Sequence, residues 1–307
     1  IKEFRSQKLE VPLICIVRDD PRRLQILDEI ELGIYGWYEP ENSPVEDLKE
    51  LINSANQFHE FLKNVPKISK RHFKSNGYHR IVGTSKEMIS IYHMLVQIKN
   101  KDVTTILYGE SGTGKNLISN TIHETGLRRD RPMVAVNCPA IPSELLESEL
   151  FGHEKGAFTG AVDRKDGKFL AANAGTIFLD EIGDMSPSLQ SKILRVLESG
   201  EIERVGGAQT IKVSVRIISA TNQNLEQRIK DGLFRQDLFH RINVFPITVP
   251  SLRSRKSDIP LTAMAILNKL SKKHQTQVKY ISPGAMNLLK SYSWDGNVRE
   301  LEHILER

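Results

Sequence analysis

The sequence predicts an α/β fold, a parallel sheet with helices on both faces, followed by a small all-helical domain. Four apolar runs in the middle of the chain are separated by helical stretches: residues 103–108, 133–136, 176–179 and 215–219. Short apolar strands that alternate with helices are typical of a parallel sheet that is buried on both faces. After Pro250 such strands cease, and residues 261–273, 283–291 and 298–307 have the pattern of helices.

Composition places the chain among ordinary globular proteins, with 39% hydrophobic and 26% charged residues in 307. No apolar run comes near the roughly 18–20 residues that span a bilayer, and the N-terminus lacks the apolar core of a signal peptide. We therefore expect a cytoplasmic protein without membrane contact. Cys15 and Cys138 are far apart in sequence, so two reduced, buried thiols are expected. Because the chain opens on Ile1 rather than methionine, we expect a fragment of a longer protein.

Residues 1–62 predict a small α/β segment that cannot bury a good core alone. We expect strands at 11–17 and 35–38, a helix at 22–32 and an amphipathic helix at 45–62. This order resembles the second half of a response-regulator receiver domain, a module of two-component systems. Glu39 precedes Pro40 where receivers carry a lysine, and the half that would bear the phosphorylated Asp is absent. These residues therefore give no ground for predicting phosphorylation of this segment.

A basic stretch separates this segment from the α/β domain, which we expect at residues 81–250. Residues 63–80 hold six Lys or Arg residues and no acid, more than the whole net charge of +5. A solvated basic linker explains the stretch better than a DNA-binding patch, although the residues alone leave both interpretations open.

A glycine-rich loop follows the first strand of the α/β domain and opens a helix. It consists of Gly109, Glu110, Ser111, Gly112, Thr113, Gly114 and Lys115. In this setting the glycines let consecutive N–H groups point at phosphate oxygens, and the helix N-terminus adds a positive dipole. Lys115 can reach β- and γ-phosphates. Asn116 stands where the general motif places a Ser or Thr hydroxyl on Mg²⁺, and its amide oxygen could face the metal.

Polar side chains end three of the predicted strands. Asp180 and Glu181 follow residues 176–179, and we expect Asp180 to hold Mg²⁺ and Glu181 to polarise an attacking water. Asn222 could orient that water or the γ-phosphate, or it could simply cap a helix. Asn137 ends the strand at 133–136, beside the acidic strand end.

Three arginines are candidates for contacts with phosphate. Arg235 and Arg241 lie six residues apart before a strand at 244–247. Alone they would pair with surface acids. In a ring of ATPase subunits they could instead act as arginine fingers, which reach the nucleotide of a neighbouring subunit and raise the hydrolysis rate by a factor on the order of 10³–10⁵. Arg299 falls in the first turn of a helix of the last domain, where it could contact phosphate in the same subunit.

A second glycine-bounded segment carries an aromatic residue between flexible positions. It consists of Gly156, Ala157, Phe158, Thr159, Gly160 and Ala161. Glycines on both sides of an aromatic indicate a backbone that bends freely while a ring is presented. A loop tip of that kind usually contacts a partner rather than a core.

These motifs, in this order, resemble the AAA+ domain of bacterial enhancer-binding proteins, the activators of sigma-54 RNA polymerase, over residues 81–307. The resemblance implies an AAA+ P-loop NTPase core with a helical lid at 251–307, ATP and Mg²⁺ as cofactors, and a hexameric ring that is a dimer when inactive. It implies that residues 156–161 contact sigma-54 holoenzyme and that residues 200–207 form a second surface loop. No helix-turn-helix follows the lid within the given sequence, so either a domain outside this chain would bind promoter or enhancer DNA, or the protein would act without enhancer binding.

The resemblance also assigns roles within the site. Asp180 and Glu181 would form the Walker B pair, Asn222 sensor I and Arg299 sensor II. Asn137 would restrain Glu181 as a switch, and Arg235 and Arg241 would be trans fingers.

The chain departs from the family pattern at four positions, where Asn116 and Leu170 replace a common Glu, Ala174 a common Gly and Asp295 a common Pro. The competing interpretations are a nucleotide-binding regulator with impaired hydrolysis and, more remotely, a generic AAA+ unfoldase.

Overall fold

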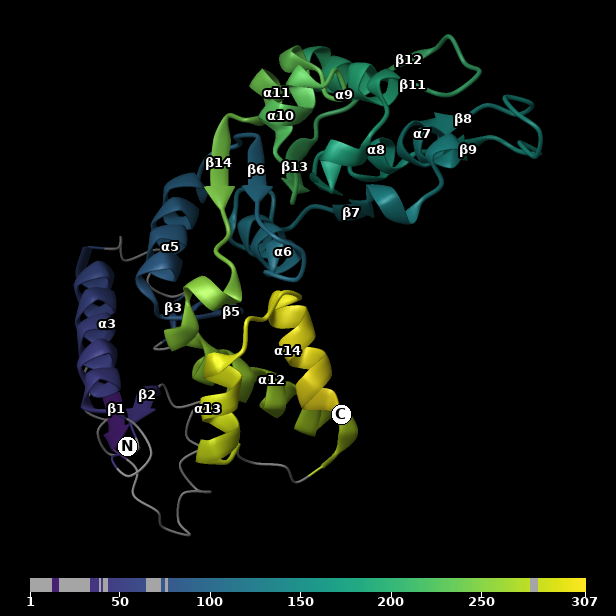
Figure 1. Cartoon of the computed structure of the whole chain (residues 1–307). Helices are drawn as coiled ribbons and strands as arrows, with labels where there is room; N and C mark the ends of the chain where they lie inside the picture. The colour runs from purple at the N-terminus through teal and green to yellow at the C-terminus, as the bar shows by residue number, and fades with distance from the viewer. Residues whose placement is uncertain are drawn as a thin grey trace. The chain divides into compact units, whose positions relative to one another are not determined.

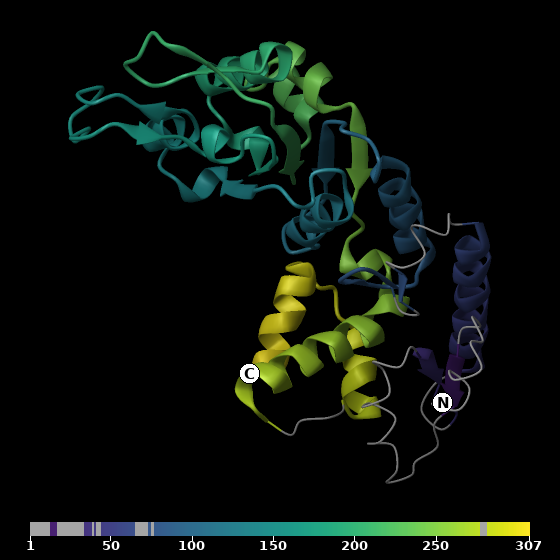
Figure 2. The ribbon, with the colours of Figure 1, turned by 180° about the vertical axis from the view of Figure 1, so that it is seen from behind.

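The computed structural model describes residues 13–16, 34–38, 40, 44–64, 73–74, 77–276 and 281–307. The chain divides into two compact units (Figure 1, and from behind in Figure 2). The first unit contains residues 1–96, 111–113 and 250–307, and the second contains residues 97–110 and 114–249. None of the helices within the described ranges combines the length and apolar character that crossing a membrane requires.

The second unit is built on a five-stranded sheet in the order β14-β6-β13-β10-β7, with every neighbouring pair parallel. The strands are β6 (Thr105–Tyr108), β7 (Met133–Asn137), β10 (Thr176–Asp180), β13 (Arg216–Thr221) and β14 (Phe245–Thr248). All six residues of β13 are buried, as expected for an apolar run inside a parallel sheet. The predicted parallel sheet is confirmed.

Helices of the second unit pack against this sheet. They are α6 (Lys115–Thr125), α7 (Ser143–Phe151), α8 (Lys168–Ala171), α9 (Pro187–Ser199), α10 (Leu225–Lys230) and α11 (Gln236–Ile242). Ile177 and Leu179 of β10, Ile193 of α9 and Leu238 of α11 are completely buried in one apolar core. Cys138 is buried and forms no disulfide, and burial raises the pKa of its thiol to about 12. The side chain of Cys15 lies outside the described residues.

Two antiparallel ribbons extend from the second unit. One pairs β8 (Gly152–His153) with β9 (Lys165–Asp166), and the other pairs β11 (Glu201–Glu203) with β12 (Thr210–Lys212). The segments that join the strands of each ribbon project from the same side of the unit in both views (Figures 1 and 2). The second of these segments contains most of the predicted second surface loop.

The C-terminal part of the first unit is helical, as predicted. It contains α12 (Ile259–His274), α13 (Pro283–Ser291) and α14 (Asn297–Glu306). Leu252, Ile259, Trp294 and Leu301 are buried together in its core. These helices begin where the sequence has its signals, since Ser282 caps α13 through the Ala285 N–H and Pro283 occupies the first turn.

A buried carboxylate connects the lid helices to the strand-helix junction at residues 83–85. Asp258 is fully buried and accepts hydrogen bonds from Thr84 N (2.7 Å), Ser85 N (2.9 Å) and Ser85 Oγ (2.6 Å). Burial raises the pKa of Asp258, and the nearby Arg255 opposes that rise. Three donors on one carboxylate offset the cost of burying it.

The N-terminal part of the first unit contains β1 (Leu13–Ile16), β2 (Ile34–Tyr38), α3 (Val45–Asn64), β3 (Phe73–Lys74), β4 (Gly77–Tyr78), β5 (Ile81–Val82) and α5 (Lys86–Ile98). Phe58 and Phe61 of α3 are buried, with ring centroids 6.4 Å from Tyr92 and 4.2 Å from His93 of α5. The α3 helix thus buries its apolar face on α5, which supplies the core that the segment was expected to lack. The predicted helix at 22–32 and most of the basic stretch lie outside the described residues.

Ala174 has a left-handed backbone (φ 62°) at one of the positions where the chain departs from the family pattern. An L-residue with a Cβ is strained in this region and glycine is not, so Ala174→Gly is expected to stabilise the protein by about 1 kcal/mol. The measurement is the urea midpoint at unchanged slope. Ala171→Gly, at the last residue of the helix α8, is the matched control, and it should not raise the midpoint because its backbone is helical rather than left-handed. A lower midpoint for Ala174→Gly would contradict the strain argument.

Candidate functional site

The glycine-rich loop leaves the sheet at the carboxyl end of β6 and enters α6. Gly109 and Gly114 have φ of 155° and 105°, values that residues with a Cβ rarely adopt. The Gly109 N–H donates to Thr221 O of β13 at 3.2 Å, which ties the start of the loop to the neighbouring strand. Helix α6 then begins at Lys115, so the end of the loop adjoins the helix N-terminus, which is the positive end of the helix dipole.

Lys115 and Glu181 form an ion pair at this edge of the sheet. Lys115 is only 6% exposed, and its Nζ lies 3.2 Å from Glu181 Oε1. The same Nζ donates to Gly109 O at 2.7 Å and Glu110 O at 3.4 Å. The Asn222 N–H donates to Glu181 Oε2 at 2.9 Å. The structure therefore brings together Lys115, Glu181 and Asn222, three predicted site residues from separate segments.

Glu181 has a left-handed backbone (φ 54°, ψ 52°) directly after β10. Non-glycine residues in this region carry strain on the order of 1–3 kcal/mol and cluster at functional sites. The turn directs the Glu181 carboxylate towards α6 and β13, where its two oxygens meet Lys115 and the Asn222 N–H.

Asn137 lies beside the acidic strand end but does not bind Glu181. It is the register partner of Asp180 across β7 and β10. Among the hydrogen bonds of the described residues, none joins the Asn137 side chain to Glu181, whose carboxylate contacts Lys115 and Asn222 instead. Asn222 contributes its main-chain N–H, where the sequence pointed to its amide side chain. The sequence around Glu181 does not indicate either contact, because Lys115 and Asn222 each lie at another strand–helix junction.

The donors at this edge fit a magnesium nucleotide. Magnesium is commonly held by one or two carboxylates together with phosphate oxygens and waters, and Asp180 at the end of β10 is such a carboxylate. Lys115 provides a cation beside a glycine-rich loop. Asn116 is exposed in the first turn of α6, and its carbonyl accepts the Ser119 hydroxyl at 2.9 Å.

Residues 111–113 of the loop belong to the first unit, where the lid holds them. Asn297 Nδ2 donates to Ser111 O at 3.0 Å, and the Val298 N–H donates to Gly112 O at 3.0 Å. Arg299 Nη1 donates to Ser111 Oγ at 3.0 Å. The predicted sensor arginine thus contacts the phosphate loop itself. A Cβ on Gly112 would lie 2.2 Å from Gly296 O, so glycine is required there.

Sequence reasoning missed Asn297, which anchors this contact. It is fully buried with a positive φ of 54°, and its Oδ1 accepts the Leu252 N–H at 2.8 Å. Asparagine tolerates the left-handed region better than other residues with a Cβ, and this is the signal that could have indicated a turn at this position.

The two finger candidates lie at the two ends of α11 and are exposed. Arg235 pairs with Asp237 through Nε–Oδ1 (3.0 Å) and Nη2–Oδ2 (2.6 Å), which holds the pKa of Asp237 below its usual value. The Arg235 N–H donates to Oε1 of the buried Gln190 at 2.8 Å. Arg241 lies 3.3 Å from Glu198. In the part of the chain that the structure describes, the Arg235 guanidinium contacts Asp237 and the Ser191 hydroxyl, and that of Arg241 contacts Glu198.

The segment at residues 156–161 closes into a turn between β8 and β9. The Gly156 N–H donates to Ala161 O at 2.8 Å, and the Ala161 N–H donates to Phe158 O at 3.0 Å. Gly156 and Gly160 have φ of 82° and 105°. Phe158 is 37% exposed. The predicted bend and the accessible ring are both present.

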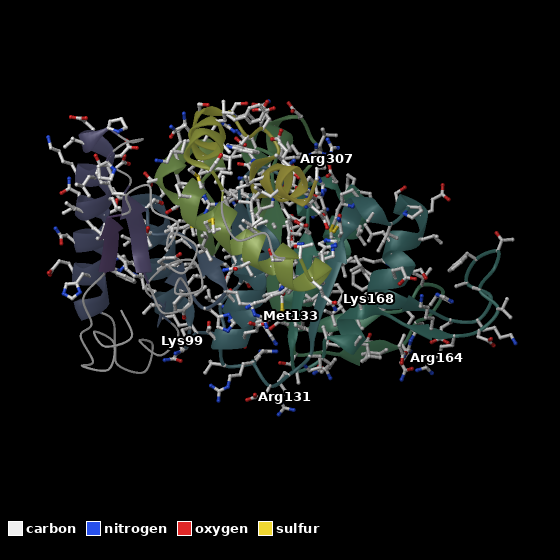
Figure 3. The ribbon with its side chains drawn as sticks, turned by 90° about the horizontal axis from the view of Figure 1, so that it is seen from below. Lys99, Arg131, Met133, Arg164, Lys168 and Arg307 are labelled. Atoms are coloured by element: carbon white, nitrogen blue, oxygen red, sulfur yellow. The ribbon has the colours of Figure 1, made fainter. Side chains whose placement is uncertain are left out.

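The second projecting segment, between β11 and β12, contacts the residues on both sides of the tip of the first projecting segment, between β8 and β9. The buried Arg204 (4% exposed) lies 3.2 Å from Glu154 and 2.8 Å from Asp166, one on each side of the 156–161 segment. The Glu154 N–H donates to Val205 O at 3.0 Å. Arg164, labelled in Figure 3, adds weaker contacts to the same two acids at 4.0 and 3.8 Å.

Leu170 packs against the apolar core of the second unit from helix α8. It therefore takes no part in the ionic contacts at the loop root. Arg204 makes those contacts with Glu154 and Asp166 instead.

Comparisons with known proteins agree with this geometry. The family model for the sigma-54 interaction domain matches residues 81–248, and the model for the AAA+ ATPase lid domain matches residues 253–307. The Nif-specific regulatory protein of Klebsiella pneumoniae is 52% identical over 231 residues, which are 75% of this chain and 44% of that protein. The regulatory protein AtoC of Escherichia coli (strain K12) is 41% identical over 309 residues, covering 100% of this chain and 66% of that protein.

Among solved structures, NtrX from Brucella abortus in complex with ATP superposes with a TM-score of 0.69 at 34% identity. The match covers 99% of this chain and 68% of that one. The chain spans less than half the length of the Nif-specific relative. On the matched domains and the phosphate-loop geometry, the chain belongs to the family of sigma-54-dependent transcriptional activators and carries the AAA+ domain and lid of that family.

Proposed function

We propose that this chain hydrolyses ATP and uses the hydrolysis to remodel sigma-54 RNA polymerase holoenzyme, which opens the promoter. The observation that carries the proposal is the Lys115–Glu181 pair beside the glycine-rich loop, with Nζ and Oε1 3.2 Å apart. A phosphate-binding cation and a carboxylate able to accept a proton from water are the two groups that hydrolysis requires.

Each residue of the site has a role in this proposal. Lys115 binds the β- and γ-phosphates together with the main-chain N–H groups of residues 109–114. Asp180 holds Mg²⁺, which neutralises phosphate charge when bound. Glu181 accepts the proton of the attacking water. Asn222, through its N–H to Glu181 Oε2 at 2.9 Å, keeps that carboxylate oriented.

The Lys115–Glu181 pair is also the basis for a proposal of how nucleotide binding prepares the site for hydrolysis. In the structure Lys115 neutralises Glu181. Phosphate oxygens compete for the same ammonium group, so binding of nucleotide would draw Lys115 away and leave Glu181 free to polarise water. Asn137, the register partner of Asp180, is proposed to be the switch residue that restrains Glu181 until water is to be polarised.

The fingers are proposed to act across a subunit interface of a homo-oligomeric ring, six subunits in this family, with a dimer as the inactive form. Arg235 and Arg241 are exposed, and in the described part of the chain their only charged partners are Asp237 and Glu198. Arg299 acts on the loop of its own subunit through Ser111. Assembly would then be a condition of turnover.

The tip at residues 156–161 is proposed to contact sigma-54. Its turn is closed by its own main chain, and Phe158 is accessible. Arg204 joins both sides of its root to the second segment, so a displacement of either segment is transmitted to the other. DNA binding through a domain outside this chain, and a cytoplasmic location, complete the proposal.

Phe158→Ala is the variant that tests the tip. We expect sigma-54-dependent transcription to fall by roughly 30-fold, the effect of losing one interface hot spot, while steady-state phosphate release stays within about twofold. Val162→Ala is the matched control, because Val162 is 72% exposed just beyond the tip. If Phe158→Ala preserves transcription at unchanged ATP turnover, the tip does not contact sigma-54.

The runner-up function is a nucleotide-binding regulator that assembles without hydrolysis. Asn116 and Leu170 favour it, since both replace acidic residues of the family and Leu170 packs in the core. A phosphate-release assay on the oligomer separates the two, because such a regulator binds ATP without turnover.

A further inference from the structure

His153 lies where three segments of the second unit meet. It ends β8, is only 9% exposed, and forms a parallel bridge with Val205 of the second projecting segment. Its Nδ1 lies 2.7 Å from Ser148 Oγ of α7, a buried hydrogen bond. The backbone bridge and this hydrogen bond together fix the orientation of the imidazole ring.

The tip aromatic rests against this ring. The ring centroids of His153 and Phe158 are 5.0 Å apart at an interplanar angle of 68°, the edge-to-face arrangement that aromatic pairs prefer. The tip itself is closed by main-chain hydrogen bonds, from Gly156 to Ala161, from Ala161 to Phe158, from Ala157 to Glu154 and from Val162 to Gly160. These bonds involve the backbone alone, and among the ring contacts of the described residues the one with His153 ties the Phe158 side chain to the body of the unit.

We propose that His153 is a positioning residue that holds Phe158 in a resting position, from which the tip is released when it engages its protein partner. This inference deepens the proposed function of the tip and rests on it. An aromatic pair shifts an equilibrium by roughly two- to tenfold, which is weak enough for a partner surface to replace. Ser148 acts through His153 by fixing the ring, and the backbone bridge to Val205 links the His153 main chain to the second segment.

Chymotryptic cleavage after Phe158 measures the release directly, because the protease must take the Phe158 ring into its own pocket. The full chain is digested briefly without nucleotide or sigma-54, and fragments are quantified by mass spectrometry. His153→Leu, which removes the ring, is expected to speed cleavage after Phe158 by roughly two- to tenfold. Cleavage after Tyr292, which is 50% exposed in the lid, should be unchanged and serves as the internal control.

Two further variants separate positioning from general loss of structure. His153→Phe keeps a ring for Phe158 and is expected to remain within about twofold of the wild type. Ser148→Ala leaves the imidazole but frees its orientation, so it should give an increase smaller than that of His153→Leu. The positioning role of His153 predicts cleavage rates that decrease in the order His153→Leu, Ser148→Ala, His153→Phe.

Equal cleavage after Phe158 in the wild type and His153→Leu would overturn the inference. An increase of the same size after Phe158 and Tyr292, in His153→Leu and Ser148→Ala alike, would also overturn it, since that result shows general opening. The assay contains neither ATP nor sigma-54, so its outcome is independent of the transcription test. Faster cleavage after Phe158 in His153→Leu, together with unchanged transcription in Phe158→Ala, would refute the proposed function of the tip while leaving the role of His153 intact.

Discussion

Replacing Glu181 by Gln is expected to lower steady-state phosphate release by roughly 10²–10⁴-fold, the contribution of a general base, while ATP still binds. The amide keeps the size of the side chain and one acceptor for Lys115 or the Asn222 N–H. It cannot take a proton from water. The measurement pairs phosphate release with equilibrium binding of a fluorescent ATP analogue.

Glu144→Gln is the matched control, because Glu144 is exposed in the first turn of α7. This variant should leave both phosphate release and binding of the ATP analogue within about twofold of the wild type. Turnover by Glu181→Gln within tenfold of the wild type would remove Glu181 from the role of base and would move the assignment to another group at the same edge of the sheet.

Arg235→Ala is expected to lower turnover by roughly 10³–10⁵-fold, as loss of an arginine finger does. Because the finger is proposed to act in trans, mixing this variant with Glu181→Gln should restore activity. In a mixed ring some interfaces combine an intact Glu181 from one subunit with an intact Arg235 from its neighbour. In an equimolar mixture about a quarter of the interfaces are in this state, so ATP turnover should return to about a quarter of the wild-type value.

Two arginine variants serve as controls for this experiment. Arg195→Ala removes an exposed arginine that pairs with Glu201 and Glu203, and it should leave turnover within about twofold. Arg241→Ala tests the second finger in the same mixing design. Failure of the mixture to regain activity, with both variants assembled, would show that Arg235 does not act across an interface.

The elements of the fold could be predicted closely from sequence. The apolar run at 176–179 became β10 (Thr176–Asp180), and the pattern at 261–273 became α12 (Ile259–His274). These elements can be predicted because their signals are local: the hydrophobic periodicity of a strand or helix and its capping residues involve positions close together in the sequence. The neighbouring glycines and prolines mark their ends.

The site could be predicted only in part, because its contacts are long-range. Lys115 and Glu181 are 66 residues apart in sequence and meet only through the strand order of the sheet. The burial of Arg204 between two acids depends on how two ribbons approach each other. Leu170 is one of the departures from the family pattern, and its side chain packs against the apolar core. The roles of all the predicted site residues, Arg235, Arg241 and Asn137 among them, stay predictions.

The most direct test of the central claim is promoter melting at a sigma-54-dependent promoter, measured together with phosphate release by the same protein preparation. The wild-type protein with ATP and Mg²⁺ is predicted to melt the promoter and to release phosphate. A non-hydrolysable ATP analogue should bind and produce no melting. Binding of ATP without phosphate release, or melting that proceeds equally with the analogue, would contradict the account.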